Sequence, residues 1–237
     1  GAVQVTGAGT SGQVLTSNGA GVDPTFQAAA GGGATAQWTW NQPELSASLS
    51  LGAGGTGTIT DSGTGQRLAT GATGNSFERM STNLPAYLAY LFDGNSYFSA
   101  TFIMGTNGTD AQFYCGVGNL TDSGTALTFT EYHYGFKRIR AASVTTWSAT
   151  NAEGTTETTT AITVGTETNG NEFSAVKAGT TDIKYYESRT LRATHTTNLP
   201  TNAAGNGIAF DAILNNANTA SNSTLTVRDY KFSQDVV

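Results

Sequence analysis

The stretch "YFSATFIMG", Tyr97 to Gly105, places apolar residues at alternate positions, namely Phe98, Ala100, Phe102 and Met104. In a β-strand, alternate residues point to the same face. An apolar face of this kind is typical of an antiparallel sheet that covers a core on one side. The stretch therefore predicts a strand whose even-numbered residues are buried.

Short apolar or alternating runs of this type recur from Gln37 onward, separated by turn clusters about every ten residues. This spacing predicts an all-β fold, one antiparallel β-sandwich or barrel with little helix. In the last run, "STLTVRDYKFSQDVV", Leu225 and Val227 share one parity, whereas Tyr230 and Phe232 take the other. We expect a bulge or bend between them, because one extra residue reverses the faces of a strand. The run "PAYLAYLF" fits a helix and a strand equally well.

The chain of 237 residues fits one β-domain of about 200 residues preceded by a tail. We expect residues 1–36 to form an N-terminal trimerisation and attachment segment that ends in the small-residue linker "AAAGGGATA". Residues 37–237 are then the β-sandwich head. Charged residues make up only 12% of the chain, and Gly, Thr, Ser, Ala and Asn take their place. The surface is therefore predicted to be polar through hydroxyl and amide groups.

The charge pattern excludes several classes of partner. The formal net charge is −6, so the basic surface of a nucleic-acid binder is absent. Lys137, Arg138 and Arg140 form the one basic cluster, and we expect them to be solvated strand residues. No apolar run is long enough to cross a membrane as a helix. The single cysteine, Cys115, lies in the apolar run "QFYCGVG" and is expected to be a buried, unreactive thiol.

The opening stretch "GTSGQVLTSNGAGVDPTFQ" has only four sizeable apolar residues, Val14, Leu15, Val22 and Phe26. Ordering about twenty residues costs roughly 1–2 kcal/mol each in backbone entropy. Four buried side chains at about 1.5–3 kcal/mol each do not offset that cost in a single chain. Three copies around an axis could bury them together, so the composition predicts a trimerisation segment.

The same stretch resembles a motif of bacteriophage fibre proteins, G-x-x-G-Q-V-L-T-S-N-G-x-G-x-x-P-x-W, over about 20 residues. The matching residues are Gly12, Gln13, Val14, Leu15, Thr16, Ser17, Asn18, Gly19, Gly21 and Pro24. Phe26 stands where the motif has tryptophan. The resemblance implies a homotrimeric structural protein at the virion surface, attached to other virion proteins. The strand pattern and size of the rest resemble a concanavalin-like jelly-roll head.

Catalytic signatures are absent from the sequence. Glycosidases of the concanavalin-like type carry E-x-D-x-x-E on a strand, because paired carboxylates must protonate one oxygen and attack or activate another group. No such triplet occurs, and neither does the G-x-S-x-G motif of a nucleophile elbow. Glu131 and His133 share a strand face and are the best acid–base pair, although an exposed polar face explains them more simply. We therefore expect a protein that is not an enzyme.

Metal and cofactor sites are not indicated either. His133, His195 and Cys115 are too few for a typical zinc site. The loops "FDGNS" and "NGTD" offer oxygen ligands for calcium, but turn formation explains these residues equally well. We expect no cofactor, with calcium as the open alternative.

A carbohydrate is the expected ligand, because sugars are held by aromatic rings with amides and carboxylates at their hydroxyl groups. Trp147 precedes Asn151 and Glu153 in "TTWSATNAEG", and Tyr132 and Tyr134 supply further rings. The alternative is that Trp147 and several tyrosines are core or trimer-contact residues. The adjacent pair at positions 185 and 186 must face opposite ways in a strand, so one of the two is expected in the core.

Three functions follow in order of preference. The first is a bacteriophage fibre or spike whose outward head binds host surface glycan. The second is a capsid decoration protein without a receptor role. The third is a tail spike that cleaves glycan.

Overall fold

The computed structural model of the chain describes residues 13–16, 25–28, 36–41, 49–54, 57–61, 65–74, 76–82, 94–106, 108–118, 120, 127–129, 131–142, 144–201, 210–217 and 221–236. The chain divides into two compact units, residues 1–37 with Val237 and residues 38–236. The run "PAYLAYLF", Val22 and Pro24 lie outside the described residues.

The first unit contains a two-stranded antiparallel sheet, formed by β1 (Gln13–Thr16) and β2 (Thr25–Ala28). Its register places Leu15 opposite Phe26 and Val14 opposite Gln27. A two-stranded sheet of this size is marginal by itself in water. Its role in trimerisation stays a prediction.

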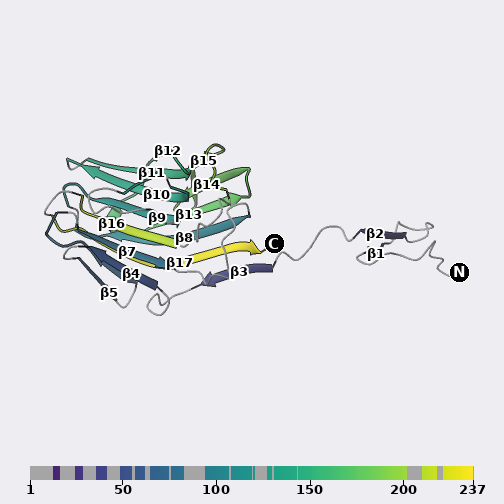
Figure 1. The fold of residues 1–237 in the computed structure, drawn as a ribbon, viewed down its shortest axis with the longest axis horizontal. Helices are drawn as coiled ribbons and strands as arrows, with labels where there is room; N and C mark the ends of the chain where they lie inside the picture. The colour runs from purple at the N-terminus through teal and green to yellow at the C-terminus, as the bar shows by residue number, and fades with distance from the viewer. Residues whose placement is uncertain are drawn as a thin grey trace. The chain divides into compact units, whose positions relative to one another are not determined.

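One layer of the second unit is a seven-stranded sheet in the order β12-β11-β10-β9-β16-β7-β4, and all its pairings are antiparallel. Its strands are β12 (Thr156–Ile162), β11 (Val144–Glu153), β10 (His133–Ala141), β9 (Gln112–Gly118), β16 (Phe210–Asn215), β7 (Phe77–Thr82) and β4 (Leu49–Gly54). Figure 1 shows these strands side by side.

The other layer is an eight-stranded sheet that follows the order β15-β14-β13-β8-β17-β6-β5, with β3 (Ala36–Asn41) paired to β17. The pairings along this order are antiparallel. Its strands are β15 (Thr190–His195), β14 (Asp182–Glu187), β13 (Asn171–Ala178), β8 (Ser96–Met104), β17 (Thr224–Val236), β6 (Gln66–Ala69) and β5 (Thr58–Asp61).

The main core lies between the two sheets and is rich in aromatic rings. Phe98 and Phe102 of β8 meet Phe113, Phe136 and Phe173 there, and all five are at most 1% exposed. Ring centroids 4.8–6.1 Å apart place these side chains in tilted and edge-on contacts, which add to the free energy of burial. The predicted all-β antiparallel sandwich is confirmed, and the even-numbered face of β8 is buried as expected.

The bulge predicted in the last strand is also confirmed. The register of β17 against β8 shifts between Arg228 and Lys231, and Asp229 has a φ of 50°. Leu225 and Phe232 can therefore both be buried although their parity differs. The described residues contain one short 3₁₀ helix, η2 (Glu167–Asn169), and no helix among them is long enough to cross a membrane.

A second, smaller apolar cluster covers the outer face of the seven-stranded sheet, which is the face away from the main core. Tyr114 and Ile213 of the sheet pack there with Leu120, Leu127 and Phe129. Residues 127–129 thus cover part of a face that would otherwise meet solvent.

Candidate functional site

Trp147 lies on strand β11 with its ring in the core. Only 5% of the residue is exposed, and the indole stacks on Phe173 with the ring centroids 4.8 Å apart and the planes 16° apart. The expectation that Trp147 stands beside a polar loop is therefore wrong, and the alternative that it is a core residue is confirmed. Trp147 shares its parity on β11 with Ala149, which is also in the core, so the strand turns both inward.

An ion pair between the buried Arg138 and the partly exposed Glu167 fixes the polar edge of the Trp147 ring. The indole Nε1 donates a hydrogen bond of 2.5 Å to Oε1 of Glu167. The Arg138 guanidinium donates to both oxygens of the same carboxylate, at 2.7 Å and 2.9 Å. This two-point geometry offsets the cost of burying a cation that has no exposed surface. The ring is consequently held in one orientation.

The basic cluster is not solvated as predicted. Arg138 is fully buried, Lys137 is 8% exposed and Arg140 is half-buried. Lys137 forms an ion pair with Glu157, and its Nζ lies 4.7 Å from the centroid of the Phe129 ring. The expectation was wrong because both cations find carboxylates that are distant in sequence.

A surface pocket of about 350 Å³ opens beside the Trp147 ring. We call it the Trp147 pocket, and its lining is Thr145, Thr146, Trp147, Ala161, Ile162, Thr163, Val164, Gly165 and Glu167. The hydroxyl-bearing residues Thr145, Thr146 and Thr163 are exposed. The Glu167 carboxylate is neutralised by Arg138. The lining therefore combines hydroxyl groups, apolar surface and one aromatic edge.

Asn151 and Tyr134, two further predicted glycan residues, are fully buried and cannot reach a ligand in this conformation. The Asn151 amide donates to the carbonyl oxygens of Thr197 and Asn198 at 3.0 Å and 2.6 Å. The Tyr134 hydroxyl is 2.7 Å from Oγ of Ser96 on the opposite sheet. Both side chains join parts of the fold, so their assignment to a glycan site is corrected.

Tyr132 and Glu153 lie at the other end of β11 from the Trp147 pocket. Glu153 is exposed and accepts a hydrogen bond of 2.6 Å from the Thr201 hydroxyl. Tyr132 is half-buried at the edge of the core, and a Cβ at Gly154 would lie 3.5 Å from its hydroxyl oxygen. The predicted glycan residues therefore do not form one site.

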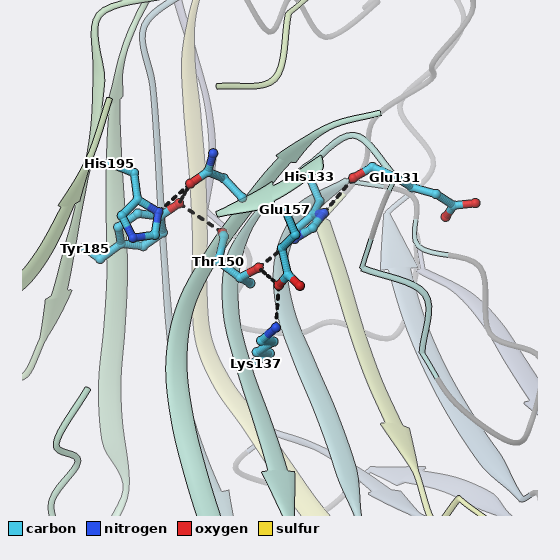
Figure 2. A network of polar contacts seen from close by, with 8 residues as sticks. Glu131, His133, Lys137, Thr150, Glu157, Tyr185 and His195 are labelled. Atoms are coloured by element: carbon cyan, nitrogen blue, oxygen red, sulfur yellow. Dashed lines mark hydrogen bonds and ion pairs between the residues drawn. The ribbon is translucent and has the colours of Figure 1, made fainter. Parts of the chain in front are cut away.

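A polar network joins the two histidines to β11 (Figure 2). His133 Nδ1 is 2.6 Å from the backbone oxygen of Glu131, and its Nε2 is 3.0 Å from Oγ1 of Thr150. The Thr150 hydroxyl also lies 2.5 Å from Oε1 of Glu157. On the other side of Thr150, its backbone oxygen accepts a hydrogen bond of 3.0 Å from the Tyr185 hydroxyl.

The histidines are not placed for catalysis. His133 has no exposed surface, and burial lowers the pKa of its imidazole to about 4. It contacts Glu131 through the backbone carbonyl. His195 contacts Asn151 Oδ1, and burial lowers its pKa as well. A buried imidazole of this kind has no surface on which a substrate could bind.

Metal ligands do not cluster in the part of the chain that is described, where no group of three His, Cys, Asp or Glu residues could hold an ion. Asp110 of the "NGTD" loop accepts a hydrogen bond of 2.8 Å from the backbone N–H of Ala142, as a turn residue would. Asp93 and Asn107 lie outside the described residues, so the calcium alternative remains a prediction. Burial raises the pKa of the Cys115 thiol well above its usual range, as expected of an unreactive thiol.

No model of a known protein family and no curated protein matches the sequence. Solved structures match it through the fold. A mutant of HCR/D superposes with a TM-score of 0.50, at 10% identity over 80% of this chain and 44% of that one. The receptor binding domain of botulinum neurotoxin C/D mosaic serotype gives 0.48, at 11% identity over 78% and 42%. The ligand binding domain of botulinum neurotoxin serotype D, solved with N-acetylneuraminic acid, gives 0.46, at 12% over 80% and 43%.

At these identities the likeness concerns the fold alone. The chain spans less than half the length of each of these three structures. The β-sandwich architecture is thus shared with domains that are much longer.

Proposed function

We propose that this chain is a homotrimeric fibre protein of a bacteriophage, with a non-catalytic sandwich head that binds host surface glycan. The N-terminal stretch attaches the protein to other virion proteins, and the head points outward from the virion surface. The resemblance of residues 9–27 to fibre motifs supports the virion role. The observation that carries the glycan role is the Trp147 pocket.

The pocket suits a sugar for three physical reasons. Its volume of about 350 Å³ is at the lower end of the range of small-molecule sites. Exposed threonine hydroxyls can both donate to and accept from sugar hydroxyls. The Trp147 ring is held by Phe173 and Glu167, so little side-chain entropy is lost when a ligand packs against it.

Removing single hydroxyls from the pocket tests the glycan role. We expect Thr145→Val and Thr163→Val each to weaken glycan binding by about 5- to 10-fold, the value of one hydrogen bond. The measurement is a glycan array followed by calorimetric titration of the sugars that bind. Thr194→Val, an exposed change on β15, is the matched control and should leave the affinity unchanged.

Other results of the binding test would support a different site or a different function. Binding that both pocket variants leave unchanged would move the ligand elsewhere, with Tyr132 and Glu153 as the next site to test. If the head binds no glycan, and images of the particle place this protein on the capsid, a decoration role would be favoured. Release of new reducing ends from host polysaccharide would show that the head is an enzyme.

The assembly state tests the role of the first unit. We expect the full chain to form trimers and a chain that starts at Gln37 to assemble more weakly, because β1 and β2 are too short to be stable alone. Light scattering at several concentrations measures this. A monomeric full chain at high micromolar concentration would contradict the proposal. An equally stable truncated trimer would place the trimer contact in the head.

A further inference from the structure

His133, Thr150 and Glu157 form a row of polar contacts. These contacts cannot all be hydrogen bonds when the imidazole is neutral and the carboxyl group is ionised. His133 Nδ1 faces a backbone carbonyl at 2.6 Å, so Nδ1 must carry a hydrogen. A neutral imidazole then has only a lone pair at Nε2, and this lone pair needs a donor. Among the described residues, the Thr150 hydroxyl is the hydrogen-bond neighbour of Nε2, 3.0 Å away.

Thr150 has one hydroxyl proton and two candidate acceptors. Its Oγ1 lies 3.0 Å from His133 Nε2 and 2.5 Å from Glu157 Oε1. When the proton points to Glu157, Nε2 must carry a second proton to bond Oγ1. When it points to His133, the Glu157 carboxyl must itself be protonated. Both contacts are hydrogen bonds only if one additional proton is present.

We propose that His133, Thr150 and Glu157 share one dissociable proton, and that its loss opens the contact between His133 and Thr150. The proton resides on the imidazole or on the carboxyl, and the Thr150 hydroxyl turns to match. After its loss, the hydroxyl proton stays with the Glu157 carboxylate, because hydrogen bonds to a charged acceptor are the stronger ones. His133 Nε2 and Thr150 Oγ1 then face each other with lone pairs, and the contact is lost.

The groups around the shared proton come from both sides of the sheet. Lys137 of β10 forms an ion pair with Glu157, and burial disfavours a charged His133. Tyr114 of β9 places its ring edge-on to His133 at 5.5 Å, and burial raises its phenol pKa well above the usual value.

On the core face, Tyr185 bonds the Thr150 backbone oxygen, and burial raises its pKa likewise. His195 lies beyond Asn151, and burial lowers its pKa. The tyrosines stay neutral through acidic and neutral pH, and the lowered pKa also favours a neutral His195. His133 and Glu157 therefore control the charge at this point.

The contact that opens also supports the covering segment of the outer face. Phe129 packs on the His133 ring at 6.0 Å and lies under the Lys137 ammonium group. The backbone oxygen of Glu131 is held by His133 Nδ1. The shared proton thus controls a pH-dependent contact between the sheet and the segment that contains residues 127–129 and Glu131, and this contact is closed at low pH and opens as the pH rises.

The test follows the His133 ring nitrogens by ¹⁵N NMR from pH 2 to 8 in the full chain, a range that extends below the imidazole pKa of about 4. We expect a one-proton transition in the natural protein and in Thr150→Ser, which keeps the hydroxyl. Glu157→Gln supplies a permanent N–H donor to Thr150, so the imidazole should stay neutral and hydrogen-bonded, with its midpoint lowered by more than about one pH unit. Glu157 is partly exposed, so this variant keeps the fold.

A second arm separates a shared proton from simple attraction between charges. The shift of the His133 midpoint caused by Glu157→Gln is measured again in a Thr150→Val background. There it should be at most about a third of the shift in the natural background, because the Thr150 hydroxyl that links the two groups is gone. An equal shift in both backgrounds would overturn the proposal. So would a His133 ring whose nitrogen signals do not change across the whole pH range in the natural protein. Amide hydrogen exchange at positions 131–133 should accelerate above the midpoint only where the relay is intact.

Discussion

Replacing Trp147 with alanine is expected to lower the free energy of unfolding of the sandwich by about 3–5 kcal/mol, the usual cost of removing a buried aromatic ring. The ring is 5% exposed, stacks on Phe173 and meets Phe113 edge-on with centroids 5.9 Å apart. The substitution also removes the N–H donor to Glu167 and leaves a cavity beside the Arg138 guanidinium. Both effects act in the same direction.

Urea denaturation of the two proteins measures the loss. Thr146→Ala, an exposed change one residue away, is the matched control and should stay within about 0.5 kcal/mol of the natural chain. Trp147→Phe keeps most of the ring but not its N–H, so we expect a loss between the two. A cost below about 1 kcal/mol for Trp147→Ala would show that the ring is not packed as described. Because of this structural role, glycan binding is better tested with threonine changes in the pocket.

The fold could be predicted from the sequence because its signal is local. The spacing of Phe98 and Phe102 alone indicates that they share a face, since the side-chain period of a strand is two. In the same way, the change of parity between Leu225 and Phe232 indicates the bulge, which lies at Asp229. Alternation and turn residues suffice for such inferences, and they need no knowledge of partner strands.

The site could not be predicted as well, because its interactions join residues distant in sequence. Arg138 shares its parity with the core residue Phe136, but a buried arginine is favourable only with a partner. That partner, Glu167, lies 29 residues away in a turn that carries no motif. The same holds for Glu157, which is 20 residues from Lys137. Residue type alone therefore suggested solvated cations where the fold holds ion pairs.

The burial of Trp147 also could not be predicted from its neighbours in the sequence. Its neighbours in the sequence are threonine, serine and asparagine, which suggested an exposed polar loop. The same residues are compatible with a strand whose outer face bears hydroxyls, and this is the arrangement of β11. A single aromatic residue in a threonine-rich stretch cannot decide between these two environments, because burial depends on the opposite sheet.

Glu78 is a buried acid whose ionisation should cost stability. It lies on β7, opposite Leu214 of β16, and shares its parity with the core residue Met80. The residue has no exposed surface, and neither carboxylate oxygen has a hydrogen-bond partner in the structure as described. Burial raises the pKa of Glu78 to about 7. Removing a carboxylate from water without a compensating partner favours its protonated form.

Glu78→Gln is therefore expected to leave stability at pH 4 nearly unchanged and to raise it at pH 8 by up to about 3 kcal/mol. Because the pKa is higher in the folded state, the unfolded chain loses this proton first as the pH rises. The natural protein consequently loses stability between about pH 4.5 and 7, and the loss levels off above that range. The amide cannot ionise, so the variant escapes this loss. Denaturant unfolding of both proteins from pH 4 to 9 measures the difference, with Glu153→Gln as the exposed control that should show no such trend. A difference that stays constant across this range would show that the folded state does not hold the Glu78 proton.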